Sequence, residues 1–515
     1  MSNAENNKRI AKNTIFLFFR MFFTMGVSLY TTRIVLKTIG IEDFGIYNVV
    51  GGVVFMMAFL TSSMSTATQR FISFELGKKD YNQLQKIFCM SINIHAIIAF
   101  SIFILAETIG LWFLNNKLVI PPERVNAANW VYQFSVLTFI VSIMSVPYNA
   151  TIIAQERMKI YAYISIVETI LKLIIVFALL WVGFDKLKMY AILVFCVSFI
   201  TGVIYKIYCK RNFPSTKYTF IWDKNLFKIL LSYSSWNLFG GLAGVTMGQG
   251  VNILLNIFFG PTVNAARAVA FQIKGAVNMF VTNFQMAINP QIVKSYAIKD
   301  ITYMHKLIFQ GSKFSFFLLY LFTLPILLET KVILEIWLNT VPEFTVVFTR
   351  LAMINILIDC MSGTLMTAAQ ASGNIKKYQT VIGGMLLLIL PISFVFLKIG
   401  YPPQVTLYIS ISISIIALFA RLIIISKLVD FPIKLFLRKV LFRVVLVTII
   451  SLILPLIFKY TILPKYIRFF ITIIFSIISV LFSIYWFGLI KEEQLFLRRK
   501  VKSSFLKLKL NFKFL

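Results

Sequence analysis

The sequence predicts an all-α polytopic membrane protein with about fourteen transmembrane helices, and composition and patterning carry this prediction. Apolar residues make up 59% of the 515-residue chain, charged residues only 14%, and the mean hydropathy is +0.84. A soluble chain carries about a quarter charged residues. The charges gather in clusters, and the apolar runs between them reach about 20 residues, enough to cross a hydrocarbon core of about 30 Å as a helix. A β-barrel would show short alternating segments instead.

The apolar runs give the expected spans in chain order. The start, MSNAENNKRIAKN, is polar and basic, and no small-residue cleavage site follows it before Arg33, so the first span is expected to be an uncleaved signal anchor. The spans are expected near residues 12–36, 44–66, 88–114, 128–153, 161–183, 188–209, 228–257, 264–290, 312–336, 344–369, 378–398, 403–428, 437–459 and 465–489.

The net charge of +32 arises from Lys and Arg in the loops between the spans, so it does not indicate binding to nucleic acid. The head and every second loop are rich in Lys and Arg, as at Lys78–Lys79 and Lys210–Arg211. Because cytoplasmic loops retain such residues and lie against an anionic leaflet, both termini are expected in the cytoplasm, which requires an even number of spans. The predicted location is the inner membrane of a bacterium, in contact with membrane lipids and without nucleic acid.

The chain also predicts an internal repeat. The stretch from Gly40 to Asp80 aligns without a gap with that from Gly260 to Asp300, and a second echo links AQERMKIYAY, from Ala154, to AQASGNIKKYQ, from Ala369. Chance similarity between apolar helices is the alternative. A true repeat gives two six-helix lobes with a substrate path, or central cavity, between them. The expected boundaries are 1–211, 212–430, a pair of helices over 431–489, and a basic tail over 490–515.

Catalytic and metal-binding motifs are not apparent in the sequence. It shows no phosphate-binding Gly-rich loop, HExxH or GxSxG motif, and no connection long enough for a soluble domain. The four cysteines and two histidines lack metal-ligand spacing. We therefore expect a protein that is not an enzyme and has neither cofactor nor metal.

Charges inside spans are the informative residues, since a charge at the bilayer centre costs at least about 3 kcal/mol. Arg20 lies on a polar face of the first span, and Arg267, Lys274 and Asn278 lie on one face of the eighth. Gln249 begins a similar face on the seventh. These residues either line a cavity or serve structure, the cations by snorkelling and the amides by interhelical hydrogen bonds. Lys274 is near mid-span, which favours the cavity.

Three further charges are candidates for ion coupling or gating. Glu168 and Lys172 are four residues apart and are expected to pair on one helical face, as a neutralised structural pair or as a gate. Asp359 shares a face with Asn355, and it either couples transport to protons or sodium or pairs with a cation of the other lobe. Because cations outnumber acids among these residues, the expected cargo is an anion such as a phosphate or pyrophosphate.

The opening NKRIAKNTIFLFFR…SLYTTRIVLKTIGIEDFGIYNVVGG, followed by STATQRFISFELGKKD, resembles the polysaccharide-export branch of the multidrug/oligosaccharidyl-lipid/polysaccharide (MOP) superfamily. The resemblance is strongest over residues 8–80 and covers nearly the whole chain. It implies a MATE-like fold whose two six-helix lobes rock in alternating access, with two added C-terminal helices. Carried over to this sequence, Arg20, Arg267 and Lys274 would line a cationic cavity.

The same resemblance implies a cargo: an undecaprenyl-pyrophosphate-linked oligosaccharide, flipped by a protein that is expected to be monomeric, driven by an ion gradient or the membrane potential. This would place the chain in O-antigen, lipopolysaccharide or other polysaccharide biosynthesis. The alternatives are a cation-coupled multidrug antiporter of the same superfamily, a flippase for the peptidoglycan lipid precursor, and a membrane-embedded glycosyltransferase or polymerase.

Overall fold

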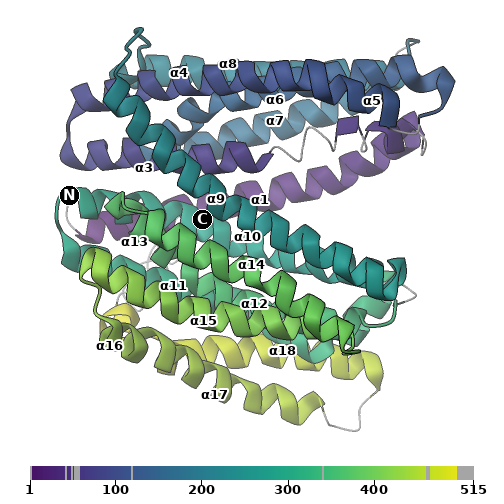
Figure 1. Ribbon diagram of the computed structural model, residues 1–515. Coiled ribbons are helices and arrows are strands. Elements are labelled where there is room, and N and C mark those ends of the chain that lie inside the picture. The colour runs from purple at the N-terminus through teal and green to yellow at the C-terminus, as the bar shows by residue number, and fades with distance from the viewer. Residues whose placement is uncertain are drawn as a thin grey trace, which may run out of the picture. The chain divides into compact units, whose positions relative to one another are not determined.

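The protein is helical throughout its described residues, which in this computed structural model are 3–40, 43–47, 50–51, 58–117, 120–181, 183–338, 341–459 and 464–495 (Figure 1). These residues contain no β-strand. The predicted all-α polytopic class is therefore confirmed.

The helices of the first half of the chain include three short π or 3-10 turns, labelled η. They are α1 (Asn3–Ile39), α3 (Ala58–Lys78), α4 (Tyr81–Leu105), η1 (Ala106–Gly110), α5 (Leu111–Lys117), η2 (Pro122–Arg124), α6 (Val125–Ala154), α7 (Met158–Ala178), α8 (Lys186–Asn212), η3 (Pro214–Thr216) and α9 (Lys224–Phe259).

The second half begins with two of the longest helices and ends with a helical pair. Its elements are α10 (Pro261–Ala297), α11 (Ile301–Leu338), α12 (Thr345–Asp359), η4 (Cys360–Ser362), α13 (Gly363–Ser372), α14 (Lys376–Lys398), α15 (Val405–Val429), α16 (Ile433–Phe436), η5 (Leu437–Leu441), α17 (Phe442–Lys459), α18 (Lys465–Ser483) and η6 (Ile484–Gly488).

Twelve helical stretches of the described chain are long and apolar enough to cross a membrane. They correspond to the expected spans with two exceptions. The expected span 44–66 falls partly outside the described residues. The expected span 264–290 forms a 37-residue helix, α10, but does not count among the twelve. Its polar stripe, which includes Arg267 and Lys274, makes it less apolar than its neighbours. A helix of this kind needs protein or water against its polar face.

The described chain divides into two compact units. The first comprises Met1–Gly248, Thr282–Leu307 and Met366–Leu388. Within it, α6 packs against α8 and α3, and α1 packs against α7 (Figure 1). Fully buried apolar side chains such as Leu84 and Phe88 of α4 fill part of its core. Burial of such side chains contributes about 1.5–3 kcal/mol each to packing in water, and in lipid close packing replaces that gain.

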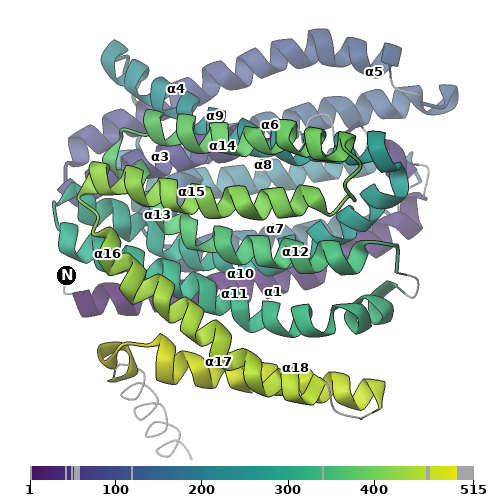
Figure 2. The same ribbon diagram turned by 60° about the horizontal axis from the view of Figure 1, so that its bottom comes forward.

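The second unit comprises Gln249–Val281, Ile308–Leu365 and Ile389–Leu515. In it α12 packs against α15, and α17 lies alongside α18 (Figure 2). The rings of Phe458 and Phe475 stack at 4.1 Å between α17 and α18, and the Ser479 hydroxyl donates to the Ser451 carbonyl at 2.9 Å. An aromatic contact and an interhelical hydrogen bond are both typical of helix pairs in membranes.

The turns of the predicted repeat share one backbone geometry. Lys79 and Lys299, which the alignment pairs, both adopt left-handed backbone angles, with φ of 62° and 61°. Asp80 and Asp300 follow them and each caps the next helix, accepting from the backbone N–H of Gln83 at 2.9 Å and Tyr303 at 3.0 Å. Two identical helix–turn–helix joints at equivalent positions argue against chance similarity.

Candidate functional site

Lys274 is held by neutral polar partners in the second unit. Its Nζ donates to Asn355 Oδ1 of α12 at 2.8 Å, and Asn355 Nδ2 in turn donates to Ser414 Oγ of α15 at 2.9 Å. Asn355 and Ser414 are each 5% exposed. The hydroxyl therefore orients the amide so that its oxygen faces the ammonium. An ammonium has three N–H donors, and this hydrogen bond uses one of them.

Asp359 belongs to the same cluster. It ends α12 one turn after Asn355, where the helix gives way to the tighter turn η4. It therefore shares a helical face with Asn355, the amide that holds Lys274. The structure thus brings together a predicted binding cation and a predicted coupling acid. Asn278, another predicted site residue, lies one turn after Lys274 on α10 and is half-buried.

Arg267 forms a second polar cluster on α10, two turns before Lys274. Its Nη1 donates to Asn252 Oδ1 of α9 at 2.9 Å, and its guanidinium lies 4.2 Å from the centre of the Phe271 ring. Asn252 Nδ2 donates to Gln249 Oε1 at 3.4 Å. The predicted residues Arg267 and Gln249 are therefore joined through one amide.

Arg20 lies in the first unit. Its Nη2 donates to Asn283 Oδ1 at 2.8 Å, and its guanidinium stacks over Tyr161 at 4.8 Å. Because Lys274 and Arg267 belong to the other unit, the structure does not define the three cations as one site. Glu168 and Lys172 form the expected pair at 2.6 Å, with side chains 32% and 46% exposed.

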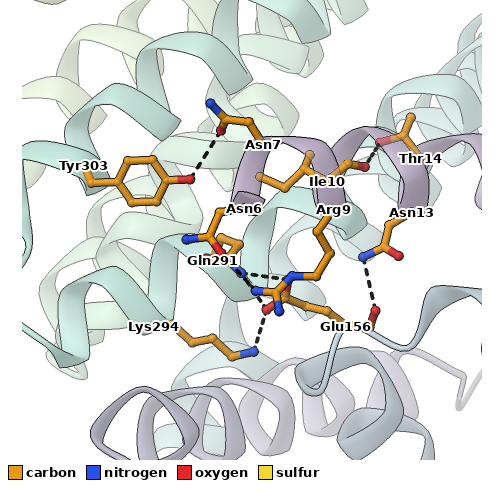
Figure 3. Close-up of polar contacts among 10 residues, drawn as sticks. All are labelled: Asn6, Asn7, Arg9, Ile10, Asn13, Thr14, Glu156, Gln291, Lys294 and Tyr303. Atoms are coloured by element: carbon orange, nitrogen blue, oxygen red, sulfur yellow. Dashed lines mark hydrogen bonds and ion pairs between the residues drawn. The ribbon is translucent and has the colours of Figure 1, made fainter. Parts of the chain in front are cut away.

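The pattern of the sequence did not reveal the most buried acid of the first unit, Glu156, in the turn between α6 and α7 (Figure 3). Its side chain is 0% exposed. Lys294 and Gln291 of α10 contact its carboxylate, Lys294 Nζ at 2.5 Å and Gln291 Nε2 at 2.8 and 2.7 Å. Arg9 Nε of α1 pairs with it at 2.8 Å, and Asn13 Nδ2 donates to its backbone carbonyl at 3.1 Å. We call Arg9, Glu156, Gln291 and Lys294 the Glu156 joint.

Glu156 also has a left-handed backbone, with φ of 59°. A residue with a Cβ pays about 1–2 kcal/mol for this conformation, which glycine or asparagine adopts more easily. The side-chain contacts of Glu156 offset that cost. Strain at a charged, buried residue in a tight turn is more typical of a functional position than of a mere connection.

A second joint involves Arg70, near the end of α3. Its Nε and Nη2 donate to the carbonyls of Gln370 and Ala371 at 3.1 and 2.8 Å. These carbonyls lie in the last turn of α13, where a helix leaves its C=O groups without internal partners. A Cβ at Gly373, whose φ is +80°, would lie 2.8 Å from Arg70 Nη2, so glycine is required there. We call Arg70, Gln370, Ala371 and Gly373 the Arg70 joint.

Metal-ligating side chains are the remaining candidates for a site. Within the residues that the structure describes, no group of three or more His, Cys, Asp or Glu side chains could hold a metal ion. The clusters described above consist of cations, amides and carboxylates, groups that can bind and orient a polar ligand.

The fold is similar to that of solved MATE and MOP superfamily proteins. It matches a MATE protein in the straight conformation with a TM-score of 0.70 at 13% identity, covering 82% of this chain and 97% of that one. It matches an outward-facing multidrug resistance MATE family transporter of the MOP superfamily with a TM-score of 0.69 at 14% identity, covering 81% and 96%. A MOP superfamily transporter from Pyrococcus furiosus, described as having a binding pocket of reverse polarity, gives 0.65 at 13%, covering 81% and 96%. The molecule thus has a MATE-like fold, with twelve helical stretches among its described residues that are long and apolar enough to cross a membrane.

The family follows from the sequence match. The model of the polysaccharide biosynthesis protein family matches residues 10–296, more than half of the 515-residue chain, and the chain belongs to this family. A comparison with curated protein sequences found no match. The predicted membership of the polysaccharide branch of the MOP superfamily is therefore confirmed.

Proposed function

We propose that the protein flips a lipid-linked oligosaccharide carrying a phosphate or pyrophosphate, with the undecaprenyl-pyrophosphate-linked repeat unit of a surface polysaccharide as its cargo. The proposal places the protein in a bacterial inner membrane with both termini in the cytoplasm. The lobes expected over 1–211 and 212–430 would alternate access in a monomer, driven by a proton or sodium gradient or by the membrane potential.

The observation that carries this proposal is the environment of Lys274. Its direct partner is an amide oxygen rather than a carboxylate, although it lies on a helix expected to cross the membrane. Among the described residues, Lys274 forms its hydrogen bond with this amide and no ion pair with a carboxylate. An ammonium held by a neutral amide keeps donors and charge for an anionic ligand, and phosphate is the ligand that such a point charge suits.

Drug export by the same superfamily is the competing function, because two of the similar structures are MATE proteins. Fold alone does not decide between the cargoes, since the Pyrococcus furiosus protein shares it with a pocket of reverse polarity. The family match to polysaccharide biosynthesis proteins and the amide-held Lys274 both favour the saccharide.

Deletion of the gene followed by analysis of membrane lipids tests the proposal. A flippase predicts loss of surface polysaccharide and accumulation of the lipid-linked saccharide on the cytoplasmic side, restored by the wild-type gene and not by Lys274→Ala. Lys398→Ala, at the exposed end of α14, is the matched control and should restore export. Unchanged lipid-linked saccharides together with increased drug sensitivity would transfer the assignment to drug export.

A further inference from the structure

The Glu156 and Arg70 joints occupy equivalent places in the two repeats. In each joint, residues near the end of a helix in one repeat contact the turn that ends a helix in the other repeat. Residues of α10 contact the turn at Glu156, and Arg70 of α3 contacts the turn at the end of α13. The alignment pairs Arg70 and Phe71 with Pro290 and Gln291, and it pairs the AQER turn with the AQAS turn. Each repeat therefore holds the turn of the other.

A third contact lies where the two repeat helices meet. A Cβ built on Gly77 of α3 would lie 2.8 Å from Ala297 Cβ and 2.9 Å from the Lys294 carbonyl of α10. Gly77 and Ala297 are themselves equivalent in the repeat, because the alignment offset that pairs Lys79 with Lys299 also pairs these two residues. A residue that touches its own counterpart lies beside a two-fold axis, as in the self-complementary interface of a symmetric dimer.

We propose that these three contacts form one reversible latch, which closes the cytoplasmic end of the transport path and must part once in each transport cycle. All its residues belong to the first unit. The cytoplasmic placement rests on the topology of the proposed function. The latch itself does not depend on which cargo is carried.

The chemistry of the latch suits repeated opening. Its polar contacts are ion pairs and hydrogen bonds, and Arg9 and Lys294 keep 32% and 19% of their side chains exposed. When such groups separate at the aqueous end of a bundle, water replaces the lost partners. At the axis the helices approach through Gly77 and Ala297, small residues that allow close contact without interdigitation.

The left-handed Glu156 gives the latch a built-in bias. Its strained turn is maintained while Arg9, Gln291 and Lys294 surround the carboxylate (Figure 3). Release of the carboxylate frees the turn to relax. In the corresponding turn of the other repeat the left-handed residue is Gly373, two positions after Ala371, and glycine adopts this conformation without strain. Opening is therefore expected to begin at the Glu156 joint.

Cross-linking at the axis tests the latch. The Gly77→Cys/Ala297→Cys double variant needs the two Cβ atoms to separate by only about 1 Å to reach the mean disulfide spacing of about 3.8 Å. In proteoliposomes containing lipid-linked oligosaccharide, we expect oxidation to stop flipping and reduction to restore it. The single-cysteine variants control for disulfide formation with the native thiols of Cys89, Cys196, Cys209 and Cys360.

A second measurement needs no cargo, so it separates failure of the latch from failure of the proposed function. Ser295 is 3% exposed and shares the face of α10 with Gln291, one turn away. We expect Glu156→Gln to increase maleimide labelling of a Ser295→Cys variant about tenfold, the effect of losing one charge-assisted bond. Glu493→Gln, which weakens a buried ion pair of the second unit, is the matched control and should leave labelling unchanged.

Flipping at an undiminished rate by the fully oxidised double variant would overturn the proposal, because the latch would then be a permanent joint. Equal labelling with and without Glu156→Gln would overturn it independently. Absence of flipping by the wild-type protein, with labelling increased as expected in Glu156→Gln, would reject the proposed cargo and keep the latch.

Discussion

Replacement of Lys274 by methionine separates a structural lysine from a binding one. Lys274→Met keeps most of the side-chain volume and removes the charge and the donors. It leaves Asn355 Oδ1, now accepting from Lys274 at 2.8 Å, without that donor, while Ser414 continues to hold the other side of the amide.

Two opposing terms set the expected change in stability. An unsatisfied buried acceptor costs about 1–3 kcal/mol. Removal of a charge from bilayer depth returns about 3 kcal/mol on insertion scales. The terms nearly cancel, so we expect the free energy of unfolding to change by less than about 2 kcal/mol. Loss of a charge-assisted bond to a phosphate removes about 1.5–3 kcal/mol of binding, which lowers affinity roughly 10- to 100-fold.

The assay measures flipping of lipid-linked oligosaccharide against cargo concentration, together with thermal unfolding of the purified protein in detergent. Lys398→Met serves as the control for removal of an exposed cation near the end of a span. Wild-type flipping by Lys274→Met with an unchanged apparent affinity would refute the argument and make the lysine a packing element. A large fall in the unfolding temperature would refute the cancellation on which the magnitude rests.

Three further outcomes are expected. Asp359→Asn should change the dependence of transport on the proton or sodium gradient, measured with imposed gradients in vesicles, and an unchanged dependence would assign the carboxylate to structure. Lys313→Ala should destabilise the protein by about 3 kcal/mol in thermal unfolding, because it leaves Glu493, 9% exposed, buried without its cation. Lys465→Ala, from a pair whose side chains are 47% and 30% exposed, should cost much less, and equal losses would contradict the role of burial. A reporter fused after residue 220 should report the cytoplasm, and a periplasmic signal there would break the predicted topology.

The fold was largely predictable from the sequence, because each span satisfies its own backbone hydrogen bonds and its length is set by the bilayer. Prediction was least reliable for a span that carries polar residues. The polar stripe of α10 makes this helix less apolar than the other spans, yet the same stripe is what identified Arg267 and Lys274 as candidates.

The candidate site was predictable only in part, for a reason of distance along the chain. The face shared by Asn355 and Asp359 is a local pattern, with a spacing of four residues, and the structure places Asn355 in contact with Lys274. The Glu156 joint assembles Arg9, Glu156 and Lys294 from three distant segments. Helical periodicity relates only residues within one helix, so it carries no signal for such contacts.

The two joints differ in chemistry, although they occupy equivalent places in the two repeats, and this difference can set the order in which they open. Both hold a turn that closes a span, and equivalence alone would make them open with equal ease. The Arg70 joint uses backbone carbonyls, which no side-chain change on α13 can remove, and its turn is relaxed by glycine. The Glu156 joint uses a carboxylate, two cations and a strained turn. Separating the buried Glu156 carboxylate from its cations is costly until water enters, but its strained turn favours release. The Arg70 guanidinium is stacked on Phe71 and Phe74, and its turn stores no such strain, so the two halves of the latch differ. An ordered opening, first at Glu156 and then at Arg70, follows from that difference.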